Sequence, residues 1–283
     1  MASFSMPAER DFGWSLKPTD STAFEIIERP NGQFCVVLNH SLLRGVSSEM
    51  IYWWFLNFPN LRVSLDGVPG YESQTVPGYL LWHPSDHCSA DLSGPLGPGG
   101  TSRAGAKIHI REAMQYNKYA LKYPVDTALS IFYCAPDGWA MGKRLPILGK
   151  VMCLRIHFKD VVSAGQVIGV NYLYEVVIGA TGNNPYVRAF NRRLTKEYSP
   201  EFFAAWHLHN AIEVGTFENF LPALFEQSGG DAVFRYAVEM NPMKTEIDPQ
   251  SAHSPDLFLS RVEGYKSAKD PHAYQASESK SFL

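Results

Sequence analysis

SPEFFAAWHLHNAIEVGTFENFLP, residues 199–222, is the segment on which the predicted architecture depends. Ser199, Pro200 and Glu201 supply a helix N-cap, a proline at the first helical position and an acidic residue in the first turn. We expect the helix to kink or end at Pro222, because proline has no N–H to donate. One long helix that follows a series of strands is typical of an α+β fold.

Five segments before this helix have the composition of strands, and loops rich in glycine and proline separate them. They are GYLLWHP (78–84), AKIHIREA (106–113), ALSIFYCA (128–135), KVMCLRIHF (150–158) and NYLYEVVIGA (171–180). Several spaced strands of this kind indicate a curved antiparallel sheet.

The chain divides into three predicted regions. Residues 1–75 form a mixed N-terminal lobe, with a strand at Phe34–Leu38 and a helix at 47–58 that Ser47 or Ser48 caps. Residues 76–241 contain the sheet and the long helix. Residues 242–283 form a polar tail, which is either loosely ordered or an arm laid over its own subunit or over a neighbour in a homo-oligomer.

Composition excludes several function classes. The chain of 283 residues carries 25 Lys and Arg against 28 Asp and Glu, so it lacks the basic surplus of a nucleic-acid-binding protein. Its four cysteines form no CxxC pair, and neither GxGxxG nor GxxxxGK[ST] occurs, which disfavours zinc ribbons and nucleotide sites. With no signal-like or membrane-spanning segment, we expect a cytoplasmic protein without membrane partners.

A carboxylate occupies an inward position in the second predicted strand. Side chains alternate along a strand, so Glu112 shares a face with Ile108 and Ile110, whereas His109 points outward to solvent. A buried carboxylate is costly to desolvate. Glu112 therefore needs a cation, a metal ion or a proton.

On the long helix, two polar residues, His209 and Glu213, likewise occupy positions in an apolar stripe. The stripe consists of Phe202, Trp206, His209, Glu213, Phe217, Phe220 and Leu224. His209 and Glu213 lie one turn apart, so both could bind one metal ion; the alternative is a hydrogen-bonded pair facing the core.

A third segment, residues 79–87, offers two more histidines. As a strand it would place Tyr79 and His83 on one face, with Asp86 and His87 following in a turn after Pro84. Either histidine could be a ligand, and Asp86 or Asp91 could orient an imidazole. Nitrogen and oxygen ligands without a thiolate suit Zn²⁺, Fe²⁺ or Mn²⁺.

At these residues the sequence resembles the 2,4-diacetylphloroglucinol hydrolase family, which includes phloretin hydrolase. The matching strings, within residues 47–226, are MIYWWF (50–55), GYLLWHPSDH (78–87), GAKIHIRE (105–112) and HNAIEVGTFENFLPALF (209–225). The resemblance implies a zinc-dependent hydrolase that cleaves a carbon–carbon bond between an acyl group and an aromatic ring. It also implies a helix-grip fold like that of the birch-pollen allergen, with an N-terminal lobe before it.

The resemblance also implies roles for particular residues. The metal ligands become His87, Glu112, His209 and Glu213, and Tyr79 becomes a substrate-binding residue, with a second tyrosine at Tyr172 or Tyr174. It selects His87 over His83 because the family tyrosine precedes its metal-binding histidine by eight residues, the spacing from Tyr79 to His87.

The resulting hypothesis is a hydrolase for an aromatic ketone or a polyketide, with Tyr79 and Glu213 as catalytic residues and Zn²⁺ as cofactor. Trp54, Trp82 and Trp206 are candidates for the wall of an apolar cavity. Other metal-dependent reactions are the first alternative, namely a non-haem Fe²⁺ oxygenase or a polyketide cyclase or isomerase that uses the same site. A module that binds apolar ligands without chemistry is the second.

Overall fold

The computed structural model describes residues 4–14, 16–65, 68, 70–228 and 233–235. Its strands are β1 (Thr22–Glu28), β2 (Phe34–His40), β3 (Leu43–Arg44), β4 (Arg62–Ser64), β5 (Thr75–Pro77), β6 (His87–Ser93), β7 (Lys107–Ala113), β8 (Pro124–Ala135), β9 (Gly138–Leu145), β10 (Gly149–Ser163), β11 (Gln166–Ile178) and β12 (Val233–Arg235). Its helices are α1 (Ser48–Asn57), α2 (Tyr79–Trp82), α3 (Tyr116–Tyr119), α4 (Pro185–Thr195), α5 (Pro200–Gly215) and α6 (Phe217–Gln227), with 3₁₀ turns at η1 (Thr19–Ser21), η2 (Pro98–Gly100) and η3 (Ala120–Lys122).

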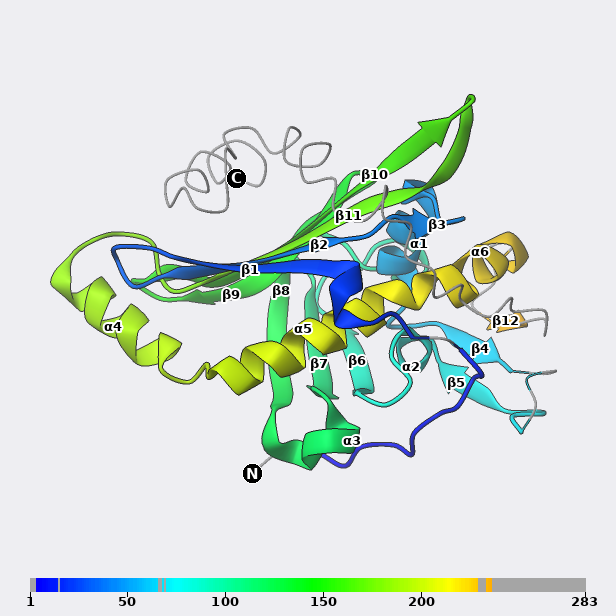
Figure 1. Cartoon of the computed structure of the whole chain (residues 1–283), viewed down its shortest axis with the longest axis horizontal. Helices are drawn as coiled ribbons and strands as arrows, with labels where there is room; N and C mark the ends of the chain where they lie inside the picture. Colours follow the sequence, from blue (N-terminus) through cyan, green and yellow to red (C-terminus); the bar gives the residue numbers. More distant parts are fainter. Residues whose placement is uncertain (1–3, 15, 66–67, 69, 229–232, 236–283) are drawn as a thin grey trace.

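A curved antiparallel sheet forms the body of the described chain. Its strand order is β1-β2-β11-β10-β9-β8-β7-β6, with β3 paired to β11, and β12-β4-β5 form a smaller sheet beside it. The helix α5 runs along one side of the large sheet, and α6 continues from its end (Figure 1). The predicted α+β helix-grip class is therefore confirmed.

Aromatic side chains join α1, α6 and the sheet into one core. Trp54 of α1 is fully buried, and its ring lies 5.0 Å from that of Phe220 and 5.9 Å from that of Phe217. Phe55, the next residue of α1, stacks on Trp139 of β9 with ring centroids 5.2 Å apart. These contacts hold α5 and α6 against the sheet and fix the position of the helix that carries His209 and Glu213.

Most predictions about helices and strands hold, and two are wrong. Four of the five predicted strand segments form, as β7, β8, β10 and β11. The strand at β2 and the helix at α1, capped by the Ser47 side chain, form as expected. The segment 78–84 is not a strand: residues 79–82 form the helical turn α2. The long helix breaks at Thr216 instead of Pro222, because the Thr216 hydroxyl turns back to within 2.7 Å of the carbonyls of Glu213 and Trp82.

The boundary expected at residue 75 does not separate two units among the described residues. β1 and β2 belong to the same sheet as β11, because the backbone of β2 pairs with β11 over residues 34–39. β1 and β2, from the expected N-terminal lobe, are therefore strands of the large sheet that was expected to belong to residues 76–241. The polar tail predicted at residues 242–283 lies outside the described residues.

The core predicts unequal roles for two adjacent tryptophans. Trp54→Ala should lower the free energy of unfolding by about 3–5 kcal/mol, the cost of removing a fully buried large side chain. Trp53→Ala is the matched control and should cost clearly less, because Trp53 is only half-buried against Phe225. Urea unfolding followed by far-UV circular dichroism measures both, and equal losses would contradict this account of the core.

Candidate metal centre

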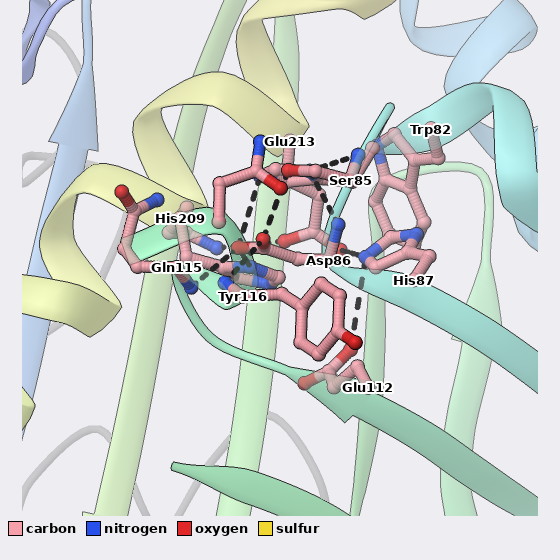
Figure 2. Close-up of polar contacts among 12 residues, drawn as sticks. Trp82, Ser85, Asp86, His87, Glu112, Gln115, Tyr116, His209 and Glu213 are labelled. Atoms are coloured by element: carbon pink, nitrogen blue, oxygen red, sulfur yellow. Dashed lines mark hydrogen bonds and ion pairs between the residues drawn. The ribbon is translucent and has the colours of Figure 1, made fainter. Parts of the chain in front are cut away.

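Four elements bring their polar side chains to one place inside the sheet. α2 and the turn after it carry residues 79–86, β6 begins at His87, β7 carries Glu112, and α5 carries His209 and Glu213. The register of β6 and β7 places His87 directly opposite Glu112. Figure 2 shows the labelled side chains of His87, Glu112, His209 and Glu213 converging. The four residues predicted as ligands are thus brought together.

The His87 ring is held in one orientation by its neighbours. Its Nδ1 lies 2.9 Å from the backbone carbonyl oxygen of Tyr79, which can only accept, so Nδ1 carries the proton. The Tyr79 ring stacks on the imidazole with centroids 3.9 Å apart. The opposite nitrogen, Nε2, faces the interior, where it is fully buried and has no hydrogen-bond partner, and in the neutral ring it presents a lone pair there.

Two carboxylates face that lone pair. Oε2 of Glu112 lies 3.6 Å and Oε1 of Glu213 lies 3.5 Å from Nε2 of His87. The Tyr79 hydroxyl donates to Oε2 of Glu112 at 2.5 Å and fixes that carboxylate. The amide of Asn210 donates to Oε2 of Glu213 at 3.0 Å, so the other oxygen of Glu213 is directed toward His87.

Asp86 orients the second histidine. Nδ1 of His209 donates to Oδ2 of Asp86 at 2.8 Å, which leaves Nε2 of His209 facing the site. Burial alone would raise the pKa of Asp86, but His83 and His209 lower the pKa of this carboxyl well below its usual range. For His209, burial lowers the pKa, but the hydrogen bond to Asp86 and the nearby Glu112 and Glu213 raise it to about 9.

The structure distinguishes His83 from His87. Nδ1 of His83 accepts backbone N–H groups of Ser85 and Asp86 at 3.3 and 3.1 Å, so the proton of the neutral ring is on Nε2. That nitrogen lies 3.4 Å from Oδ2 of Asp86. His83, Asp86 and His209 form a second group whose ligand atoms lie within 4.8 Å of one another. Only His87, however, faces both Glu112 and Glu213.

The donor set fits a metal ion. One ligand atom each from His87, Glu112 and His209 lie within 4.8 Å of one another. Two ligands bonded at about 2.0–2.1 Å to one tetrahedral ion lie roughly 3.4 Å apart, close to the 3.5 and 3.6 Å found from His87 to the two carboxylates. A lone pair that faces two carboxylates is unfavourable unless a proton or a cation lies between them.

The candidate site opens into a mostly apolar cavity of about 390 Å³. Glu112, His209 and Glu213 line it together with Tyr79, Trp82, Tyr174 and Trp206, and aliphatic and methionine side chains such as Met141, Met152 and Ile156 form other walls. Its volume lies in the range of cavities that enclose small molecules. Burial, Glu112 and Glu213 raise the pKa of the Tyr79 hydroxyl well above its usual value, which keeps it protonated.

Several other residues singled out in the sequence lie at or near the site, and others do not. Trp82 and Trp206 line the cavity, whereas Trp54 packs in the core; Tyr174 lines it, whereas Tyr172 packs against Phe217. Of the two aspartates considered, Asp86 orients an imidazole, whereas Asp91 pairs with Arg111. His109 is partly exposed beside Asp126, as predicted.

One contributor was missed at the sequence level. Asn210, which holds Glu213, lies next to His209 and three residues before Glu213. Side chains three residues apart on a helix are neighbours. This spacing in the sequence could have indicated that Asn210 contacts Glu213.

Comparisons with known proteins do not assign a family. No family model and no curated protein matches the sequence. Among solved structures, a protein of unknown function from Staphylococcus aureus, SA2116, matches with 10% identity and a TM-score of 0.37, over 65% of this chain and 94% of its own. Ara h 8.0201 matches with 13% identity and a TM-score of 0.31, over 66% of this chain and 99% of its own. Within the described residues, no helix has the length and apolar character needed to span a membrane.

The assignment of His87 as a ligand predicts metal affinity directly. His87→Gln should weaken Zn²⁺ binding by more than about 100-fold, because it removes the lone pair between the two carboxylates. His207→Gln is the control on α5, since His207 contacts the backbone carbonyl of Thr22, away from this cluster. Competition with a chelating dye measures both affinities, and equal affinities would refute the assignment.

The low pKa of Asp86 predicts acid-dependent stability. A carboxyl whose pKa is lowered by folding stabilises the fold above the unfolded value of about 3.9, and this contribution is lost as the pH falls below that value. Asp86→Asn should therefore lower the free energy of unfolding, measured with urea at neutral pH, by roughly 1.5–3 kcal/mol. The difference in this free energy between the variant and the wild type should become smaller in acid. Asp91→Asn, at a largely exposed carboxylate, should change stability by less than about 0.5 kcal/mol. A pH-independent difference for Asp86→Asn would contradict the prediction.

Proposed function

We propose that the chain is a zinc-dependent hydrolase that cleaves the carbon–carbon bond between an acyl group and an electron-rich aromatic ring, or the equivalent bond of a β-dicarbonyl polyketide. The observation that carries the proposal is the buried Nε2 of His87, which has no hydrogen-bond partner and faces Glu112 and Glu213 beside an apolar cavity. The sequence resemblance to acylphloroglucinol hydrolases supports the reaction type.

His87, Glu112, His209 and Glu213 would hold the ion. When bound, Zn²⁺ supplies Lewis acidity, which makes a water molecule acidic near neutral pH and polarises a carbonyl oxygen. Fe²⁺ is the alternative occupant of the same donor set. The residues of the chain must then position the substrate, accept a proton from the attacking water and donate a proton to the ring carbon.

Glu213 is suited to take the proton of the attacking water. Its Oε1 would have to leave the ion to accept this proton, and its side chain is 11% exposed in the cavity region, so a water molecule can reach it. The water oxygen forms a bond to the acyl carbon, and the acyl–ring bond breaks with its electron pair moving to the ring carbon. The products are a carboxylic acid and a ring that gains one hydrogen.

Tyr79 is suited to the proton that the ring carbon needs. Its hydroxyl lines the cavity, remains protonated and already donates to a carboxylate of the site. The hydroxyl can hold a ring oxygen before cleavage or pass its proton to the ring carbon during cleavage. An electron-rich ring is required because its keto tautomer delocalises the electron pair of the leaving carbon into a neighbouring carbonyl.

Water incorporation tests the reaction type. The zinc-loaded protein should cleave an acylphloroglucinol in ¹⁸O-labelled water under anaerobic conditions and place one label in the released acid. Glu213→Gln and Tyr79→Phe should each lower kcat by about 10²–10⁴-fold, while Tyr186→Phe, which removes the hydroxyl of a tyrosine that is 86% exposed, should not.

Other outcomes point to the alternatives. A requirement for dioxygen with Fe²⁺ would indicate an oxygenase, and an unlabelled rearranged product would indicate a cyclase or isomerase. Tight binding of the ketone without conversion, unaffected by Glu213→Gln, would indicate a binding module.

A further inference from the structure

Another buried histidine, His40, is connected to Glu213 through the side chain of Asn210. β2 directs Phe34, Val36 and Leu38 into the main core, and His40 takes the next position with the same alternation. His40 is only 4% exposed, so its ring nitrogens need partners inside the protein. A titratable side chain at an apolar position of a strand therefore calls for an explanation.

The hydrogen bonds of His40 lead toward the candidate metal centre. Nδ1 of His40 lies 3.0 Å from the Thr22 hydroxyl, on the residue directly opposite in β1. Nε2 of His40 lies 2.9 Å from Oδ1 of Asn210, and Nδ2 of Asn210 donates to Oε2 of Glu213 at 3.0 Å. The chain of contacts thus runs Thr22, His40, Asn210, Glu213.

The direction of these bonds is fixed by chemistry. A carboxylate only accepts, so the Asn210 amide must present Nδ2 to Glu213 and Oδ1 to His40. Oδ1 accepts as well, so Nε2 of His40 carries a proton. In the neutral ring Nδ1 then accepts from the Thr22 hydroxyl, and every donor in the chain points toward Glu213.

We propose that His40 is a positioning residue that, through Asn210, determines which oxygen of Glu213 faces His87. With Oε2 held by Asn210, the carboxylate presents Oε1 to the cluster and binds an ion through a single oxygen. Without His40, the Asn210 amide keeps only its hydrogen bond to Glu213, so Asn210 and the Glu213 carboxylate that it holds are less restrained. The inference rests on the proposed metal centre but not on the identity of the substrate.

We call the contacts from His40 through Asn210 to Glu213 the relay. Metal affinity tests the relay without any measurement of turnover. His40→Ala and Asn210→Ala should each weaken Zn²⁺ binding by about 10–100-fold, the range for groups that hold metal ligands. Because both act through one contact, the double variant should bind no more weakly than Asn210→Ala alone. His40→Gln should recover part of the loss, since its amide N–H can still donate to Asn210.

A spectroscopic readout separates positioning from general destabilisation. The absorption bands of bound Co²⁺ should shift in His40→Ala and Asn210→Ala and remain unchanged in His109→Gln, which removes a partly exposed imidazole paired with Asp126. If His40→Ala does not fold, the comparison of His40→Gln with Asn210→Ala, with folding checked by circular dichroism, provides the same test.

The contrary results are distinct. Affinity losses that multiply in the double variant, or an unchanged Zn²⁺ affinity in folded His40→Ala, would overturn the relay. A wild-type chain that binds neither Zn²⁺ nor Co²⁺ would overturn it together with the metal centre. Normal metal binding with the expected variant effects, but no cleavage of acylphloroglucinols, would refute only the proposed reaction.

Discussion

Nε2 of His87 and the two carboxylates that face it form the interaction on which the candidate site depends. Glu112 and Glu213 approach that nitrogen from different elements, at 3.6 and 3.5 Å, and the nitrogen itself is fully buried. Such an arrangement is electrostatically unfavourable unless positive charge lies between the groups. Burial lowers the pKa of His209, but the hydrogen bond to Asp86 and the nearby Glu112 and Glu213 raise it to about 9.

Around this cluster, each polar side chain has a partner that fixes its orientation. The Tyr79 carbonyl sets the proton position on His87, the Tyr79 hydroxyl holds Glu112, Asp86 holds His209 and Asn210 holds Glu213. Asp86 is itself fixed by the backbone N–H groups of Gln115 and Tyr116 (Figure 2). Preorganised ligands of this kind lose little conformational freedom when they bind an ion, which is why supporting hydrogen bonds matter for affinity.

The apolar framework explains why the cluster can persist. The aromatic core of α1, α6 and the sheet holds α5 in place. His209 and Glu213, one turn apart on α5, therefore keep a fixed position relative to the strands. The long helix bends at Thr216, directly after the cluster, where its hydroxyl meets the Trp82 carbonyl. Pro222, the break expected from its missing N–H, instead lies within α6. A tertiary contact therefore decided where the helix ends.

The sequence by itself determined the α+β class, the inward face of Glu112 and the shared helix face of His209 and Glu213, because strand and helix periods are local properties of the backbone. It misassigned residues 78–84 as a strand and left His83 and His87 as alternatives. Only the tertiary structure placed His87 opposite the two carboxylates, joined His209 to Asp86 and connected His40 to Asn210. These contacts link residues 123 and 170 positions apart, and packing between elements, which no local spacing encodes, brings them within hydrogen-bonding distance.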